Sequence, residues 1–119
     1  MANPKPEVVF DVGEGEDAKS YTLQLDFNAL CAVEDLLDTG FEEVVERLQK
    51  RPRLAVLRAV FWAGLRTHHK GITVEKAGLL IGEVGADRVR ELIDEAFTKA
   101  FPKAEEANAT EDPPVTAEA

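Results

Sequence analysis

Two adjacent histidines, His68 and His69, are the residues of this sequence whose chemistry first suggests a metal site. Neighbouring residues on a helix do not face each other, so both imidazoles could bind one metal ion only with further ligands. The sequence has a single cysteine and no His-Glu-x-x-His spacing to supply them. We interpret the pair as the basic end of a helix, where the helix dipole favours positive charge, and we predict neither a metal nor a cofactor.

Three further candidates for catalytic chemistry lack the residues that such chemistry requires. Cys31 lies in an apolar segment with no histidine nearby in sequence, which is typical of a small buried hydrophobe. The stretch Gly13-Glu-Gly-Glu16 has neither the lysine of a P-loop nor the third glycine of a dinucleotide fingerprint. The carboxylate pairs Glu34-Asp35 and Glu42-Glu43 match solvated helix faces rather than a general acid–base site. The sequence therefore predicts a protein that is not an enzyme.

Positive charge gathers in one short segment, which we call the basic group: Arg47, Lys50, Arg51 and Arg53. Cations are expected near the C-terminus of a helix because they complement the helix dipole. The functional alternative is a contact patch for an acidic segment of a partner, since complementary charges steer association. We keep the basic group as the candidate partner-binding site.

Composition limits the classes of partner and compartment. The chain has 119 residues, of which 45% are hydrophobic, so it can form one domain with a modest core. Its net charge of −9 disfavours binding to nucleic acid or to an anionic membrane surface, both of which attract Lys and Arg. A single cysteine and no apolar secretion segment indicate a cytoplasmic protein.

The segment from Leu54 to Leu65 contains one charged residue, Arg58, and is otherwise almost entirely apolar. We expect it to form the element on which the other helices and the strands pack. A helix that is apolar around most of its circumference packs against neighbours on several sides. The run is too short to span a bilayer, which needs about 20 residues. We therefore expect a central helix with Leu57 and Phe61 in the core, and we assign Trp62 to the core rather than to an interface.

Two segments alternate in polarity with the period of a β-strand, Val8–Val12 and Tyr21–Phe27. The polar, glycine-bearing segment 13–20 between them predicts a hairpin connection. Because a lone hairpin is marginal in water, its apolar face should pack on helices. Its free edge could pair with another chain or with a second copy of this one.

Helical periodicity accounts for the rest of residues 8–101, which we expect to form a single domain. A first helix should begin after Asp26 or Asn28 and reach about Asp38, and the capping box from Thr39 to Glu42 should open a second. After the central helix, Thr73 should cap a fourth helix, and a fifth should run from about residue 86 to 101. The predicted fold is α+β, mainly α, with an N-terminal β-hairpin packed on a bundle of about five helices. Residues 1–7 should be loose, and residues 102–119 should form a disordered acidic tail.

Three motifs occur in order along the chain, and together they resemble one family. They are Leu25-Asp-Phe-Asn-Ala-Leu-Cys-Ala-Val-Glu34, Leu57-Arg-Ala-Val-Phe-Trp-Ala-Gly-Leu-Arg66 and Gly71-Ile-Thr-Val-Glu-Lys-Ala-Gly-Leu-Leu-Ile81. The sequence over residues 7–101 resembles the tail assembly chaperone family of gene transfer agents, prophages and related siphophages. Members of that family are sometimes labelled tail tube proteins.

The resemblance implies a non-enzymatic protein of the host bacterial cytoplasm. Such a protein would bind the tape-measure protein, keep it soluble and help to recruit tail-tube subunits. Tube subunits are β-rich, so the mainly helical pattern favours the chaperone over a structural tail or tail-tube-associated protein. A small acidic regulatory or adaptor module is a further alternative. The expected partners are the tape-measure and tail-tube proteins, with self-association through the hairpin edge, and the basic group is the expected contact.

Overall fold

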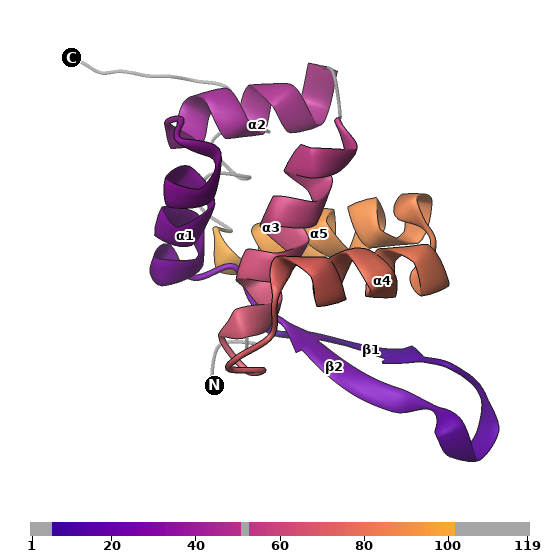
Figure 1. Cartoon of the computed structure of the whole chain (residues 1–119). Helices are drawn as coiled ribbons and strands as arrows, with labels where there is room; N and C mark the ends of the chain where they lie inside the picture. The colour runs from indigo at the N-terminus through magenta and orange to yellow at the C-terminus, as the bar shows by residue number, and fades with distance from the viewer. Residues whose placement is uncertain (1–5, 51–52, 102–119) are drawn as a thin grey trace, which may run out of the picture.

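The computed structural model describes residues 6–50 and 53–101. Within these ranges the chain forms an antiparallel hairpin and five helices, so the predicted α+β, mainly α fold is confirmed (Figure 1). The elements are β1 (Val8–Val12), β2 (Lys19–Leu23), α1 (Phe27–Leu37), α2 (Phe41–Lys50), α3 (Leu54–Arg66), α4 (Val74–Val84) and α5 (Ala86–Ala100). The predicted disordered tail at residues 102–119 lies outside the described residues, as do residues 1–5 of the predicted loose N-terminus.

The hairpin buries one face and exposes the other, as the alternation in β1 predicts. The register pairs Val8 with Leu23 at one end and Val12 with Lys19 at the other. β2 ends at Leu23, earlier than predicted. Continued by two residues, the register would place Leu25 opposite Pro6, which has no N–H to donate to a neighbouring strand. The assignment of Phe27 to the buried strand face was wrong. Phe27 begins α1 instead, and its side chain is 78% exposed.

The predicted capping residues agree with the structure at two of three helix starts. Asp26 caps α1 by accepting a hydrogen bond from the Ala29 N–H at 2.8 Å, and Thr73 caps α4 by accepting one from the Lys76 N–H. The capping box at Thr39 was wrong, because α2 begins only at Phe41. A carboxylate oxygen of Glu34, reaching across from α1, accepts the Phe41 N–H at 2.8 Å. A tertiary contact thus replaces the local cap.

The helix α3 is the centre of the fold, as predicted. It contacts the other four helices and β2, and its residues Leu57 and Phe61 are 3% and 0% exposed. The ring centroid of Phe10 on β1 lies 5.7 Å from that of Phe61, so the hairpin packs its apolar face on this helix. Leu54, at the N-terminal end of α3, departs from the pattern because its side chain is 73% exposed.

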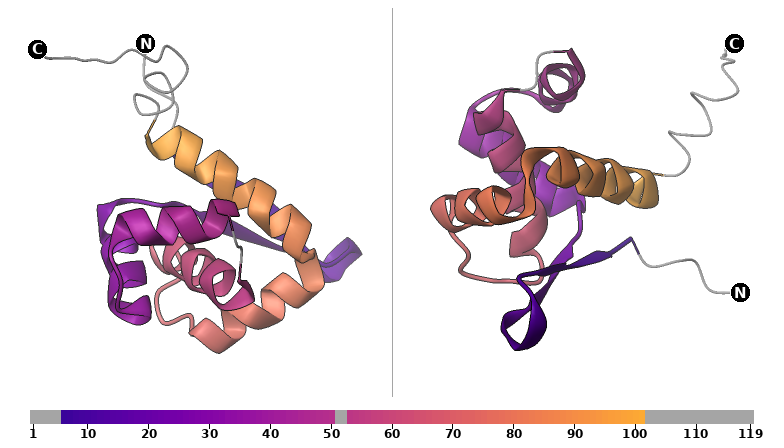
Figure 2. Two further views of the ribbon diagram at one scale, coloured as in Figure 1. Left: turned by 90° about the horizontal axis from the view of Figure 1, so that it is seen from above. Right: turned by 90° about the vertical axis from the view of Figure 1, so that its right-hand side faces the viewer.

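One glycine lets α3 and the hairpin approach closely. A Cβ atom at Gly64 would lie 2.6 Å from Cδ1 of the buried Leu23. The backbone carbonyl of Gly64 accepts a hydrogen bond from the Gln24 N–H at 3.0 Å. The hairpin runs below the helices, and its turn lies at the bottom in the right-hand view of Figure 2. No helix in residues 6–50 and 53–101 has the length and apolarity needed to cross a membrane.

Candidate partner-binding surface

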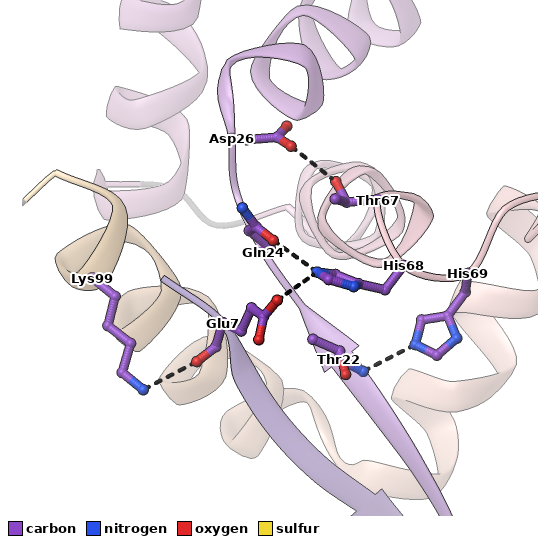
Figure 3. Close-up of polar contacts among 8 residues, drawn as sticks. All are labelled: Glu7, Thr22, Gln24, Asp26, Thr67, His68, His69 and Lys99. Atoms are coloured by element: carbon purple, nitrogen blue, oxygen red, sulfur yellow. Dashed lines mark hydrogen bonds and ion pairs between the residues drawn. The ribbon is translucent and has the colours of Figure 1, made fainter. Parts of the chain in front are cut away.

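The two histidines just after α3 fix the position of β2. Nε2 of His69 accepts a hydrogen bond from the Thr22 backbone N–H at 2.9 Å (Figure 3). An imidazole nitrogen can accept a hydrogen bond only when it carries no proton. Burial of His69, and secondarily the charge that His68 can carry beside it, lower the pKa of His69 below its usual value. Both effects favour the neutral form that the bond to Thr22 requires.

His68, just beyond α3, contacts the residue before β1 and the residue after β2. Its Nε2 lies 2.7 Å from Oε1 of Gln24 and 3.2 Å from Oε2 of Glu7 (Figure 3). The backbone carbonyl of Glu7 also accepts a hydrogen bond from Nζ of Lys99 on α5 at 3.1 Å. Glu7 therefore contacts both His68, which follows α3, and Lys99 on α5. It is the last residue of the segment that we predicted to be loose.

The prediction of a basic helix terminus is accordingly incomplete. His68 and His69 lie just beyond the end of α3, but they also attach the hairpin to it through Thr22, Gln24 and Glu7. The polar face of the second predicted strand was the only sequence signal for these contacts. The two imidazoles have different partners, and the described residues contain no group of three or more potential metal ligands. The absence of a metal stays a prediction.

The outer edge of β1 carries backbone groups that β2 does not pair. The Thr22 N–H points to His69 and therefore away from β1, and Thr22 lies opposite Val9 in the register. Opposed residues in an antiparallel pair alternate between bonded and non-bonded positions. The N–H and C=O of Val9, and by the same alternation those of Asp11, thus point outward from the hairpin. The side chain of Val9 is 64% exposed.

A hollow of about 470 Å³ lies beside this edge. Its walls are residues 9–13 on the hairpin side and Glu83, Val84, Arg88 and Leu92 on α4 and α5. A strand edge next to an open hollow can bind an extended segment, whose backbone pairs with the edge while alternate side chains enter the hollow. We call β1's outer edge and this hollow the edge site.

The described members of the basic group lie on two helices and differ in their ionic partners. Arg47 lies 3.2 Å from the carboxylate of Glu43, and Lys50 lies 3.0 Å from that of Glu46, each pair one turn apart on α2. Arg53 is the exposed N-cap residue of α3, and Arg51 lies outside the described residues. Acidic neighbours thus offset part of the positive charge, and the role of the group in partner binding stays a prediction.

The other residues that the sequence analysis considered, Cys31, Trp62 and the glycines of the hairpin turn, have packing or backbone roles in the structure. Cys31, predicted to be buried, is partly exposed on α1. Trp62 is half-buried against the core, and its Nε1–H donates to the Ile72 carbonyl at 3.0 Å. The Arg66 guanidinium lies 5.2 Å from the centroid of the Trp62 ring. Gly13 and Gly15 have positive φ angles in the hairpin turn, which explains the glycines without a phosphate ligand.

Comparison with known proteins gives one family. The family described as "Phage tail tube protein, GTA-gp10" matches residues 7–102, a range that includes all the described strands and helices. No significant match was found among curated proteins or among solved structures.

Proposed function

Because the chain belongs to the GTA-gp10 family of phage tail tube proteins, its role is in the structure or assembly of a phage-type tail, and we propose that it is an assembly chaperone. In this proposal it binds the tape-measure protein, helps to recruit tail-tube subunits and catalyses no reaction. It acts in the cytoplasm of the bacterium in which the particles are built.

The edge site is the observation that carries this proposal. Subunits of a tail tube are β-rich, and the described part of this chain has a single two-stranded hairpin on a helical body. Such a fold cannot itself supply a large sheet, but its free β1 edge can bind a strand of a β-rich subunit. Hydrogen bonds of His68, His69 and Lys99 with Gln24, Thr22 and Glu7, respectively, attach the hairpin to α5 and to the segment after α3, which supports this proposal.

Co-expression with the tape-measure protein of the same particle tests the function. We expect the tape measure to be soluble and to co-purify with this chain, and to aggregate when expressed without it. If the tape measure is equally soluble without this chain and the two never co-purify, the chaperone function is excluded. Finished particles provide a second test, because stoichiometric amounts of this chain in them would favour the structural role that the family description names.

Val9→Pro tests the edge site itself. Proline removes the outward-pointing N–H of Val9 but leaves the hydrogen bonds between β1 and β2 in place. We expect weaker co-purification of tail-tube subunits with an unchanged melting temperature. Val9→Thr keeps both the N–H and a β-branched side chain, so it should bind like the wild type. Equal binding by the proline variant would show that partners do not use this edge.

A further inference from the structure

An apolar hollow of about 520 Å³ lies between α3 and the α4–α5 corner, on different residues from the edge site. We call it the α3–α4 groove. Leu54 and Leu57 of α3 line it from one side, and Gly78, Gly82 and Gly85 line it from the other. Leu54 is 73% exposed, so a large apolar side chain borders the groove without being buried by the fold. Exposed apolar surface that is shaped as a groove is typical of binding sites.

Gly82 weakens α4 for no reason within the described fold. A glycine inside a helix costs about 0.5–1 kcal/mol relative to alanine. Gly78 has an internal explanation, because a Cβ atom there would lie 3.1 Å from Cδ of Arg58. At Gly82 a Cβ atom would meet nothing within 4 Å among the described residues. Gly78 and Gly82 lie one turn apart on α4 and have no side chains, so the helix backbone itself forms this wall of the groove. Another chain can therefore approach it closely.

Arg58 is the charged residue that lines the groove. Its side chain is exposed, and no carboxylate within residues 6–50 and 53–101 forms an ion pair with it. An unpaired guanidinium beside an apolar surface favours an occupant that carries a carboxylate next to apolar side chains. A second copy of this chain suits the groove less well, because two molecules of net charge −9 repel each other.

We infer that the α3–α4 groove binds an amphipathic helix of a partner protein, with a bulky apolar side chain over Gly82 and a carboxylate facing Arg58. A helix is favoured over an extended segment because the groove has no strand edge to satisfy the backbone groups of a strand. The inference rests on the proposed function for the identity of the partner, in which a long helical tape-measure protein would supply the helix.

A model peptide tests the groove without the natural partner. The probe is an acetylated, amidated 18-residue peptide with leucines at i, i+3, i+4 and i+7, one glutamate beside them and mainly alanine and glutamine elsewhere, so that it is helical and nearly uncharged. Added to the full ¹⁵N-labelled chain, it should shift the amide signals of Leu54, Gly78, Gly82 and Gly85 most strongly. A peptide with glutamine in place of that glutamate should bind a few-fold more weakly, since it cannot form an ion pair with the exposed Arg58. Absence of shifts at these residues would overturn the inference.

Gly82→Leu separates binding from folding. Its side chain has open space in the folded protein and fills the groove, so we expect loss of peptide binding without loss of melting temperature. Asp94→Leu places the same side chain at an exposed position of α5 that does not line the groove, and it should leave peptide binding unchanged. Retained binding by the Gly82 variant would overturn the inference.

The same variant, co-expressed with the tape-measure protein, distinguishes the two proposals. Peptide shifts at the groove without capture of the tape measure by the wild type would support the groove and exclude the proposed partner. Capture of the tape measure by the wild type and by Gly82→Leu alike, with no peptide shifts, would exclude the groove and leave the proposed function standing. Concentration-dependent dimers that Gly82→Leu abolishes would assign the groove to a second copy and overturn the helical partner.

Discussion

At the scale of single residues, His69 couples a protonation state to the position of the hairpin. The fold lowers the pKa of His69, so the folded chain binds a proton less readily than the unfolded chain does. The contribution of His69 to stability is therefore complete above the ordinary histidine pKa of about 6.5 and is lost as the pH falls towards the lower folded value. Protonation also removes the acceptor for the Thr22 N–H.

We predict that the free energy of unfolding falls as the pH is lowered from about 7.5 to about 5.5, a range in which most carboxylates stay ionised. His69→Gln should show a smaller fall, because its amide oxygen can accept the Thr22 N–H and does not titrate. The contact between His68 and Glu7 is the same in both proteins, so the difference reports on His69. Urea melts across this range measure it, and equal slopes for both proteins would contradict the assignment.

Gly64 is required by packing rather than by backbone conformation. Alanine would gain up to about 1 kcal/mol of helix propensity, but its Cβ would press on the fully buried Leu23. Overpacking of a core typically costs about 1–3 kcal/mol, so we predict net destabilisation by Gly64→Ala. Gly82→Ala is the matched control, because it makes the same change in a helix with open space and should stabilise the chain. If Gly64→Ala is as stable as the wild type, Leu23 can move and the contact is not a constraint.

At the scale of elements, α3 carries the fold because every other helix and β2 pack on it. Phe61 is its largest fully buried side chain and contacts Phe10 across the hairpin interface. We predict that Phe61→Ala lowers the free energy of unfolding by about 3–5 kcal/mol, close to the whole stability of a small domain. A denaturant melt showing a loss below about 1 kcal/mol would remove α3 from the centre of the fold.

The elements also show which features the sequence could predict. Periodicity identified β1, α3 and α5 because burial of a continuous face imposes a regular spacing. It failed at Phe27, where the alternation continued past the end of the strand ladder. It failed again at Thr39, because the carboxylate that satisfies α2's first N–H comes from another helix. Both errors arise from contacts between different elements, which the periodicity of a single segment does not encode.

The candidate sites were harder to predict for the same reason. The edge site depends on the register of the hairpin, which sets whether the N–H groups of Thr22 and Val9 point inward or outward, and the bond from Thr22 to the distant His69 shows that they point outward. The α3–α4 groove joins residues around Leu54 to residues around Gly82, and neither segment indicates a groove by itself. The basic group was visible in the sequence, and so was its pairing, because Glu43 and Glu46 each lie four residues before a member of the group on the same helix.

At the scale of the whole molecule, net charge constrains how partners approach. A chain of net charge −9 repels an acidic partner at long range. The basic group would provide a local patch of positive charge to which such a partner could bind. Its ion pairs with Glu43 and Glu46 are exposed, and such pairs contribute little to stability. Reversal of these charges should therefore affect association much more than folding.

We predict that the double variant Arg47→Glu, Lys50→Glu binds the tape-measure protein more slowly at low salt, while its dissociation rate changes little. Charges at the rim of an interface act mainly on the association rate, and salt screens them over about 10 Å at 0.1 M. The variant Lys70→Glu, Arg90→Glu has the same net charge and reverses two exposed cations outside the basic group, so it controls for long-range repulsion. Stopped-flow association rates between about 20 and 500 mM salt compare the three proteins. If both variants slow association equally, net charge explains the effect and the basic group has no specific role in steering.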